Sequence, residues 1–159
     1  MFGIGGNDGL DTGYKYMASV CTGKVIPLSV LEDTVYSTGI LGEGYAVITT
    51  DKKIYSPVDG VIDNISNNGH SFNIISNNGL KILIHIGKDS LCDDSLPIGL
   101  EIKLKDKVKQ GQIICSYECD KTEKECIVEV AVANSDSFET FEIISQSIYD
   151  IKASVIKYK

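Results

Sequence analysis

The sequence contains no arginine and no tryptophan, and it has only three prolines and two histidines. Arginine supplies the planar fork that grips phosphate groups and reads guanine, so its absence, together with a formal net charge of −7, argues against nucleic-acid binding. The chain also lacks any apolar run that approaches the roughly 18 residues of a membrane-spanning helix. Direct membrane insertion is therefore not predicted. Because histidine is the side chain that normally titrates near neutral pH, the two histidines are the first candidates for chemistry.

The five cysteines are odd in number, and no secretory signal precedes them. Residues 1–13 are rich in glycine and lack a cationic segment followed by an apolar one. We expect reduced thiols and a cytoplasmic location. Residues 1–13 read as a flexible N-terminal arm, and residues 14–159 as a single domain with an ordinary hydrophobic content of 43%.

Short apolar runs separated by turn residues predict an all-β fold. A short helix is expected only between Ser135 and Ser145, where cap residues precede Phe138 and Phe141 at helical spacing. The predicted architecture is an antiparallel β-sandwich or flattened barrel with minor short helices. The expected strands are Ala18–Val20, Val25–Leu28, Tyr45–Thr49, Val61–Ile65, His70–Ile75, Leu80–Ile86, Ile113–Tyr117, Ile127–Val132 and Ala153–Lys157.

The Asn-Gly dipeptide at 78–79 lies between two apolar runs and predicts a β-hairpin. A two-residue loop there would set Phe72 opposite His85 and His70 opposite Gly87. In that register both imidazoles share one face, with Cβ atoms about 7–8 Å apart, and Gly87 leaves room for a small tetrahedral anion. A three-residue loop would shift the register by one and send the rings to opposite faces.

Paired histidines can do several kinds of chemistry, because a neutral imidazole has a nitrogen lone pair that serves as nucleophile, base or metal ligand. A zinc site needs three or four ligands from cysteine, histidine and carboxylate side chains. No cysteine or carboxylate lies between Phe72 and Ile86. We therefore expect no metal and no cofactor.

From about Ser19 to Tyr158, the chain resembles the glucose-type enzyme IIA domain of the bacterial phosphoenolpyruvate-dependent sugar phosphotransferase system. The two histidine-containing motifs, fifteen residues apart, are the most specific part of this similarity. The stretches that carry it are Ser19–Leu28, Ile40–Ala46, Ser56–Gly60, Gly69–Phe72 and Leu83–Asp89.

The resemblance implies a phosphohistidine carrier, and hence a phosphotransferase component. His85 would accept a phosphoryl group from the phosphocarrier protein HPr and pass it to a sugar-specific enzyme IIB. His70 would hydrogen-bond the phosphoryl group. The positions expected to support the site are Asn68, Asp33, Asp89 and Gly87. The apolar rim on which partners would dock comprises Val35, Tyr36, Ile40, Leu41, Phe72 and Leu91.

Two alternatives remain open, and departures from the family pattern near the site support the first of them. Asn68 stands where the family usually has threonine, and Ser66 and Ser95–Ile98 also differ. One alternative is a regulatory IIA-like protein that binds other proteins according to its phosphorylation state. The other is a zinc hydrolase on a similar β scaffold, which would need a third ligand and a general base near His70 and His85, roles for which Asp33 or Asp89 could be invoked.

Overall fold

The computed structural model describes residues 13–32, 34–87, 98–117, 126–144 and 150–159. All of the strand pairings are antiparallel, which confirms the predicted all-β class. The strands are β1 Lys15–Ala18, β2 Lys24–Pro27, β3 Glu43–Thr49, β4 Lys53–Tyr55, β5 Gly60–Ile65, β6 Ser71–Ser76, β7 Lys81–Ile86, β8 Ile98–Leu100, β9 Lys107–Val108, β10 Ile113–Tyr117, β11 Cys126–Val132, β12 Phe141–Ile143 and β13 Ser154–Tyr158. The helical elements are the 3₁₀ turns η1 Leu28–Val30, η2 Tyr36–Thr38 and η3 Ser135–Ser137.

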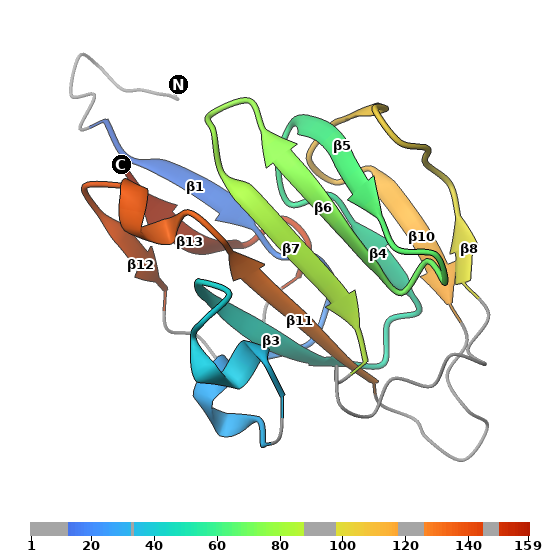
Figure 1. The fold of residues 1–159 in the computed structure, drawn as a ribbon, viewed down its shortest axis with the longest axis horizontal. Coiled ribbons are helices and arrows are strands. Elements are labelled where there is room, and N and C mark those ends of the chain that lie inside the picture. The colour runs from blue at the N-terminus through green and yellow to red at the C-terminus, as the bar shows by residue number, and fades with distance from the viewer. Residues whose placement is uncertain (1–12, 33, 88–97, 118–125, 145–149) are drawn as a thin grey trace.

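The strands of the described residues form three sheets. The seven-stranded sheet has the order β2-β3-β11-β7-β6-β5-β9, and two three-stranded sheets have the orders β1-β13-β12 and β4-β10-β8. In Figure 1 the neighbouring strands β3, β11, β7 and β6 run diagonally across the view. Strands β1 and β13 lie toward the left of the view, and β4 and β10 lie toward the right. The sheet neighbours β11 and β7 are far apart in sequence, so chain segments remote from each other meet at the centre of the large sheet.

The alternation of side chains along each strand divides the large sheet into two faces. Ile82, Ile84 and Ile86 of β7 are buried, whereas Leu83 and His85 between them are partly exposed. The three buried isoleucines belong to one core cluster that also contains residues of both small sheets. The large sheet therefore packs one face against the small sheets, in the manner of a flattened sandwich, and His85 lies on the opposite, outer face.

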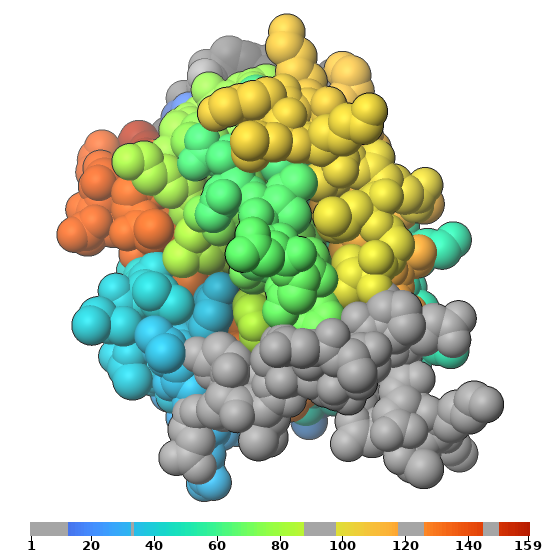
Figure 2. Space-filling model, turned by 45° about the vertical axis from the view of Figure 1, so that its right-hand side comes forward, coloured from blue at the N-terminus to red at the C-terminus, as the bar shows by residue number. Residues whose placement is uncertain are grey.

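The segment containing η1 and η2 covers part of this outer face. Leu28, Leu31 and Tyr36 from this segment pack against Ala46 of β3 and Ala131 of β11. In Figure 2 the segment, coloured blue to cyan, flanks the green surface formed by β5 and β6. It places an aromatic and aliphatic cover beside the part of β7 that carries His85.

The turn between β6 and β7 has three residues, and the predicted two-residue loop is wrong. The Ser76 N–H donates to the Leu80 carbonyl at 2.9 Å, and the Gly79 N–H donates back to the Ser76 carbonyl at 3.0 Å. Gly79 has a φ of +92°. A left-handed glycine at the third loop position is the known three-residue hairpin geometry. The Ser76 hydroxyl also accepts the Leu80 N–H at 2.9 Å, which holds this register.

The extra turn residue shifts the β6–β7 register by one. Ser71 lies opposite His85, and Phe72 lies opposite Ile84 on the core face. The expectation that Phe72 faces His85 and that His70 faces Gly87 is therefore wrong. In the observed register, strand alternation does not place both imidazole rings on one face of the sheet.

Four short strands were not anticipated, namely β4, β8, β9 and β12, and each lies at the edge of its sheet. The expected helix between Ser135 and Ser145 is also wrong. Among residues 135–144, which the structure describes, only Ser135–Ser137 is helical, and Phe141–Ile143 is a strand, in which Phe141 pairs with Tyr158. The aromatic residues whose spacing resembles a helical face pack against β13 instead. The Phe138 ring makes an edge-to-face contact with the Tyr158 ring, with 5.4 Å between the ring centroids.

The cysteines differ from the expectation of five reduced thiols. Cys21 and Cys115 are buried and free, but Cys126 at the start of β11 is disulfide-bonded. Desolvation of the two buried thiols raises the pKa of each to about 12.

Candidate active site

His85 occupies the penultimate position of β7, between two strands of the large sheet. It lies directly opposite Glu129 of β11 on one side and Ser71 of β6 on the other. Its side chain is 13% exposed. The ring of Tyr36 lies over it, with 6.2 Å between the ring centroids. The imidazole is thus held by a rigid strand and partly covered by η2.

The proton on the His85 ring is located by a contact to the backbone. Nδ1 lies 2.7 Å from the carbonyl oxygen of Gly87. A carbonyl oxygen can only accept, so Nδ1 must be the protonated nitrogen, and in the neutral ring Nε2 keeps the lone pair. Gly87 has a φ of +89°, which glycine adopts readily, and its N–H donates to the Ile127 carbonyl at 2.7 Å. The residue that fixes the tautomer is itself tied to β11.

Glu129 is a member of this site that the sequence analysis did not identify. Its carboxylate is 0% exposed, and Oε1 lies 3.3 Å from Nδ1 of His85. The available signal was a single acidic residue within the apolar run Ile127–Val132. The pairing of β11 with β7 brings it to the histidine, and that pairing is not local in sequence.

His70 precedes β6 and is 1% exposed. Its carbonyl accepts the Ile86 N–H at 2.8 Å, so its backbone lies beside the residue that follows His85. Its own N–H donates to Oδ1 of Asn68 at 3.0 Å. Gly69, with a φ of +77°, interrupts the extended chain just before His70, so simple alternation does not set the direction of this ring. Asn68 shapes the backbone that presents His70.

The other predicted site residues separate into three groups. Asp33, Asp89 and Leu91 lie outside the described residues. Val35 and Ile40 are exposed, at 49% and 80%, and Leu41 packs at the edge of the cluster formed by Leu28, Leu31, Tyr36, Ala46 and Ala131.

Two predicted rim residues are buried. Tyr36 is 7% exposed and contacts His85 rather than solvent. Phe72 is 1% exposed and lies in the core, so its assignment to a docking rim is wrong.

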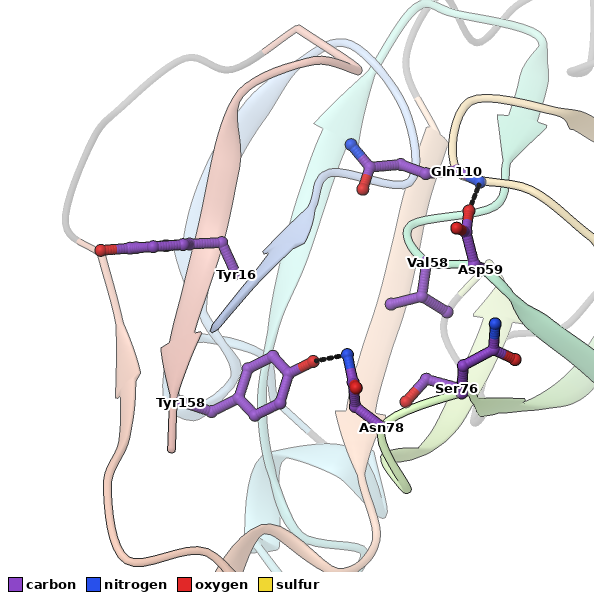
Figure 3. A pocket seen from close by; sticks show the side chains of 8 residues that line it. Tyr16, Val58, Asp59, Ser76, Asn78, Gln110 and Tyr158 are labelled. Atoms are coloured by element: carbon purple, nitrogen blue, oxygen red, sulfur yellow. Dashed lines mark hydrogen bonds between the residues drawn. The ribbon is translucent and has the colours of Figure 1, made fainter. Parts of the chain in front are cut away.

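A polar cavity of about 310 Å³ lies away from these residues, between Tyr16, Asp59, Asn78, Gln110 and Tyr158 (Figure 3). Several of its polar groups bond to one another. The Asn78 Nδ2 donates to the Tyr158 hydroxyl at 3.2 Å, and the Gln110 N–H donates to Asp59 Oδ1 at 2.8 Å. Asn78 belongs to the turn before β7, whereas His85 lies near the other end of that strand.

Within the described ranges, no three histidine, cysteine or acidic side chains gather closely enough to hold a metal ion. Over the same residues, no helix has the length and apolar character to cross a membrane.

A family model described as the phosphoenolpyruvate-dependent sugar phosphotransferase system, EIIA 1, matches residues 15–138. The chain is 26% identical over 125 residues to a glucose-specific EIIA component of the phosphotransferase system from Staphylococcus epidermidis, covering 77% of this chain and 75% of that protein. It is also 28% identical over 142 residues to the glucose-specific EIICBA component of Streptococcus pneumoniae, covering 87% of this chain and 20% of that protein. The beta-glucoside-specific EIIBCA component of Bacillus subtilis is 33% identical over 119 residues, which cover 73% of this chain and 20% of that protein.

The chain thus spans about a fifth of the length of these two multidomain relatives. Among solved structures, the glucose permease IIA of Mycoplasma capricolum superposes with a TM-score of 0.79 at 22% sequence identity. The superposition covers 91% of this chain and 95% of that one, so the two proteins share their fold.

Proposed function

The chain belongs to the EIIA 1 family of the phosphoenolpyruvate-dependent sugar phosphotransferase system, and on that premise we propose that His85 is the residue on which it carries a phosphoryl group. It is a glucose-type enzyme IIA domain, a phosphoryl-carrying transferase component of sugar uptake. The alternative of a purely regulatory protein is not favoured by its relatives, which are named as sugar-specific components.

The observation that carries the assignment of His85 is the 2.7 Å contact between its Nδ1 and the Gly87 carbonyl. This contact leaves the Nε2 lone pair as the nucleophile. In the transfer, that lone pair forms a bond to phosphorus while the bond between phosphorus and the donor breaks, and the donor keeps the electron pair of the broken bond. Nδ1 retains its proton throughout. A rigid strand suits this step, because phosphoryl transfer depends chiefly on in-line positioning and charge stabilisation.

The remaining predicted residues have supporting roles in the proposal. His70 donates a hydrogen bond to the phosphoryl group, helped by the backbone contact between His70 and Ile86. Asn68 and Gly87 hold the backbone around the two histidines. Asp33 and Asp89 flank the site by analogy with the family. The exposed Val35 and Ile40, with Leu41 and Leu91, form the apolar rim on which partners dock.

The proposed partners are the phosphocarrier protein HPr as donor and an enzyme IIB as acceptor. In two relatives the matching segment is part of a polypeptide named for its B and C components as well, which supports a B component as acceptor. We place the carrier in the cytoplasm, where a metabolic phosphoryl source such as phosphoenolpyruvate is available.

The test is to incubate the protein with phosphoenolpyruvate, enzyme I and HPr and to measure its intact mass. The parent should gain one acid-labile phosphoryl group, and His85→Ala should gain none. His70→Ala is the matched control, because it removes the other imidazole and should still be phosphorylated, more slowly. Undiminished phosphorylation of His85→Ala would overturn the assignment.

A further inference from the structure

Glu129 is a fully buried carboxylate in an apolar setting. On the outer face of β11 its neighbours are Ile127 and Ala131, which pack in the cluster covered by Leu28 and Tyr36. Burying a carboxylate is costly unless charge or hydrogen bonds compensate for the loss of water. The imidazole opposite provides such a group, because Nδ1 of His85 is 3.3 Å from Glu129 Oε1.

We propose that Glu129 is a positioning residue that keeps the proton on Nδ1 of His85 and stabilises the positive charge that the ring gains when Nε2 binds phosphorus. The inference rests on the proposed function, because it assumes that His85 is the phosphoryl acceptor.

Two oxygen atoms lie near Nδ1 of His85, and they contribute differently. The Gly87 carbonyl at 2.7 Å is the nearer and fixes the tautomer of the neutral ring. A carbonyl is only a dipole, however, whereas a carboxylate carries a full negative charge. Once the bond from Nε2 to phosphorus forms, the ring that keeps its Nδ1 proton is a cation. The buried charge of Glu129 then acts in a medium of low dielectric constant, where its interaction with the cation is strong.

The charge on the ring also governs the next transfer. When the N–P bond breaks, its electron pair returns to the ring. A ring still protonated at Nδ1 leaves as a neutral imidazole, whereas a ring that has lost this proton must leave as an anion. By holding the proton, Glu129 keeps the phosphohistidine reactive toward the next acceptor and also toward water.

The test compares Glu129→Gln with the parent. Glutamine keeps an oxygen that can accept from Nδ1 but removes the charge. The control is Glu142→Gln, which removes the same charge from an exposed position on β12. Each protein is phosphorylated through HPr and separated from its donors, and loss of the phosphoryl group is followed by intact mass at neutral pH. The same preparations are then mixed with enzyme IIB to time the onward transfer.

We expect phosphorylated Glu129→Gln to lose its phosphoryl group to water about tenfold more slowly than the parent, and to transfer it to enzyme IIB more slowly by a similar factor. Glu142→Gln should match the parent. A purely structural glutamate would give the opposite result in water, because a loosened site admits solvent. Loss of the phosphoryl group from Glu129→Gln at the parental rate or faster would therefore overturn the inference.

A second measurement needs no variant and covers the case in which Glu129→Gln does not fold. In the ¹⁵N NMR spectrum of the phosphorylated parent, Nδ1 of His85 should remain protonated at neutral pH, and a phosphorylated ring without that proton would overturn the inference. The two proposals fail separately. If the parent is phosphorylated at His85 but shows no effect of Glu129, only this inference is lost, whereas a parent that accepts nothing at His85 refutes the proposed function as well.

Discussion

The carbonyl oxygen of Gly87 lies 2.7 Å from Nδ1 of His85, two residues earlier in the chain. The same turn of backbone that ends β7 therefore orients the imidazole at its end. Gly87 has a φ of +89°, so the orientation of one reactive side chain is linked to the conformation of one glycine.

Gly87→Ala should separate this role from general stability. An alanine at a positive φ costs roughly 1–2 kcal/mol, so the free energy of unfolding in urea should fall by that amount. Phosphorylation of His85 should slow by about tenfold to a hundredfold, because the carbonyl that orients the ring moves. Gly79→Ala is the matched control. Its φ of +92° carries the same strain in the turn before β7, and its Cβ would also meet open space. It should lose similar stability and accept phosphate normally.

Replacing His70 should slow transfer without abolishing it. A hydrogen bond to a charged phosphoryl group contributes about 1.5–3 kcal/mol, so His70→Ala should reduce the rate of phosphorylation by roughly one to two powers of ten. His70→Gln keeps a donor and should still accept phosphate at His85, with the release to enzyme IIB more strongly affected. Timing the two steps separately checks this. Parental rates for both variants in both steps would make His70 a structural residue.

Substitution of Phe72 should affect stability, whereas substitution of Ile40 should affect the binding of a partner. Phe72 is 1% exposed, so Phe72→Ala should lower the free energy of unfolding by about 3–5 kcal/mol. Ile40 is 80% exposed, so Ile40→Ser should leave stability within about 0.5 kcal/mol of the parent. If Ile40 contributes to the docking rim, the KM for phosphorylated HPr should rise about fivefold to tenfold while kcat is unchanged. An unchanged KM would remove Ile40 from the rim.

Stability should fall in alkaline solution. Burial raises the pKa of the Cys21 and Cys115 thiols from 9.0 to about 12. The unfolded chain ionises these thiols near pH 9 while the folded protein keeps them neutral. The stability that they contribute is therefore fully present below pH 9 and is lost as the pH rises from 9 toward 12. Each thiol adds a slope of up to about 1.4 kcal/mol per pH unit.

Urea unfolding at a series of pH values measures this slope. Replacement of both thiols with alanine should make the alkaline decline shallower, and a decline of unchanged steepness would assign it to other groups. Burial also raises the pKa of Tyr45 and Tyr117, so part of the slope should remain in that variant.

The sequence predicted local elements such as strands and hairpins correctly. It did not predict the strand register where one loop residue determines that register. The apolar run Leu80–Ile86 correctly indicated a strand, and in the structure its isoleucines are buried on the face opposite His85. The Asn-Gly signal correctly indicated a hairpin, but it could not show that Gly79 is the third loop residue rather than the second. That one position moved Phe72 from the site to the core.

Two further features depend on contacts between segments that are distant in the chain. Glu129 meets His85 only because β11 pairs with β7, and nothing in either segment alone specifies that pairing. The aromatic residues Phe138 and Phe141 matched a helical spacing, but pairing with β13 outweighed that local preference. The edge strands β4, β8, β9 and β12 were too short to show a pattern.

The central claim, that Nε2 of His85 carries the phosphoryl group, is tested most directly by NMR of the phosphorylated protein labelled with ¹⁵N-histidine. Coupling between phosphorus and nitrogen identifies the atom that is bonded to phosphorus. The hydrogen bond from Nδ1 to Gly87 predicts coupling to Nε2 of His85 alone, with Nδ1 uncoupled. Coupling to Nδ1 of His85, or to either nitrogen of His70, would contradict the account.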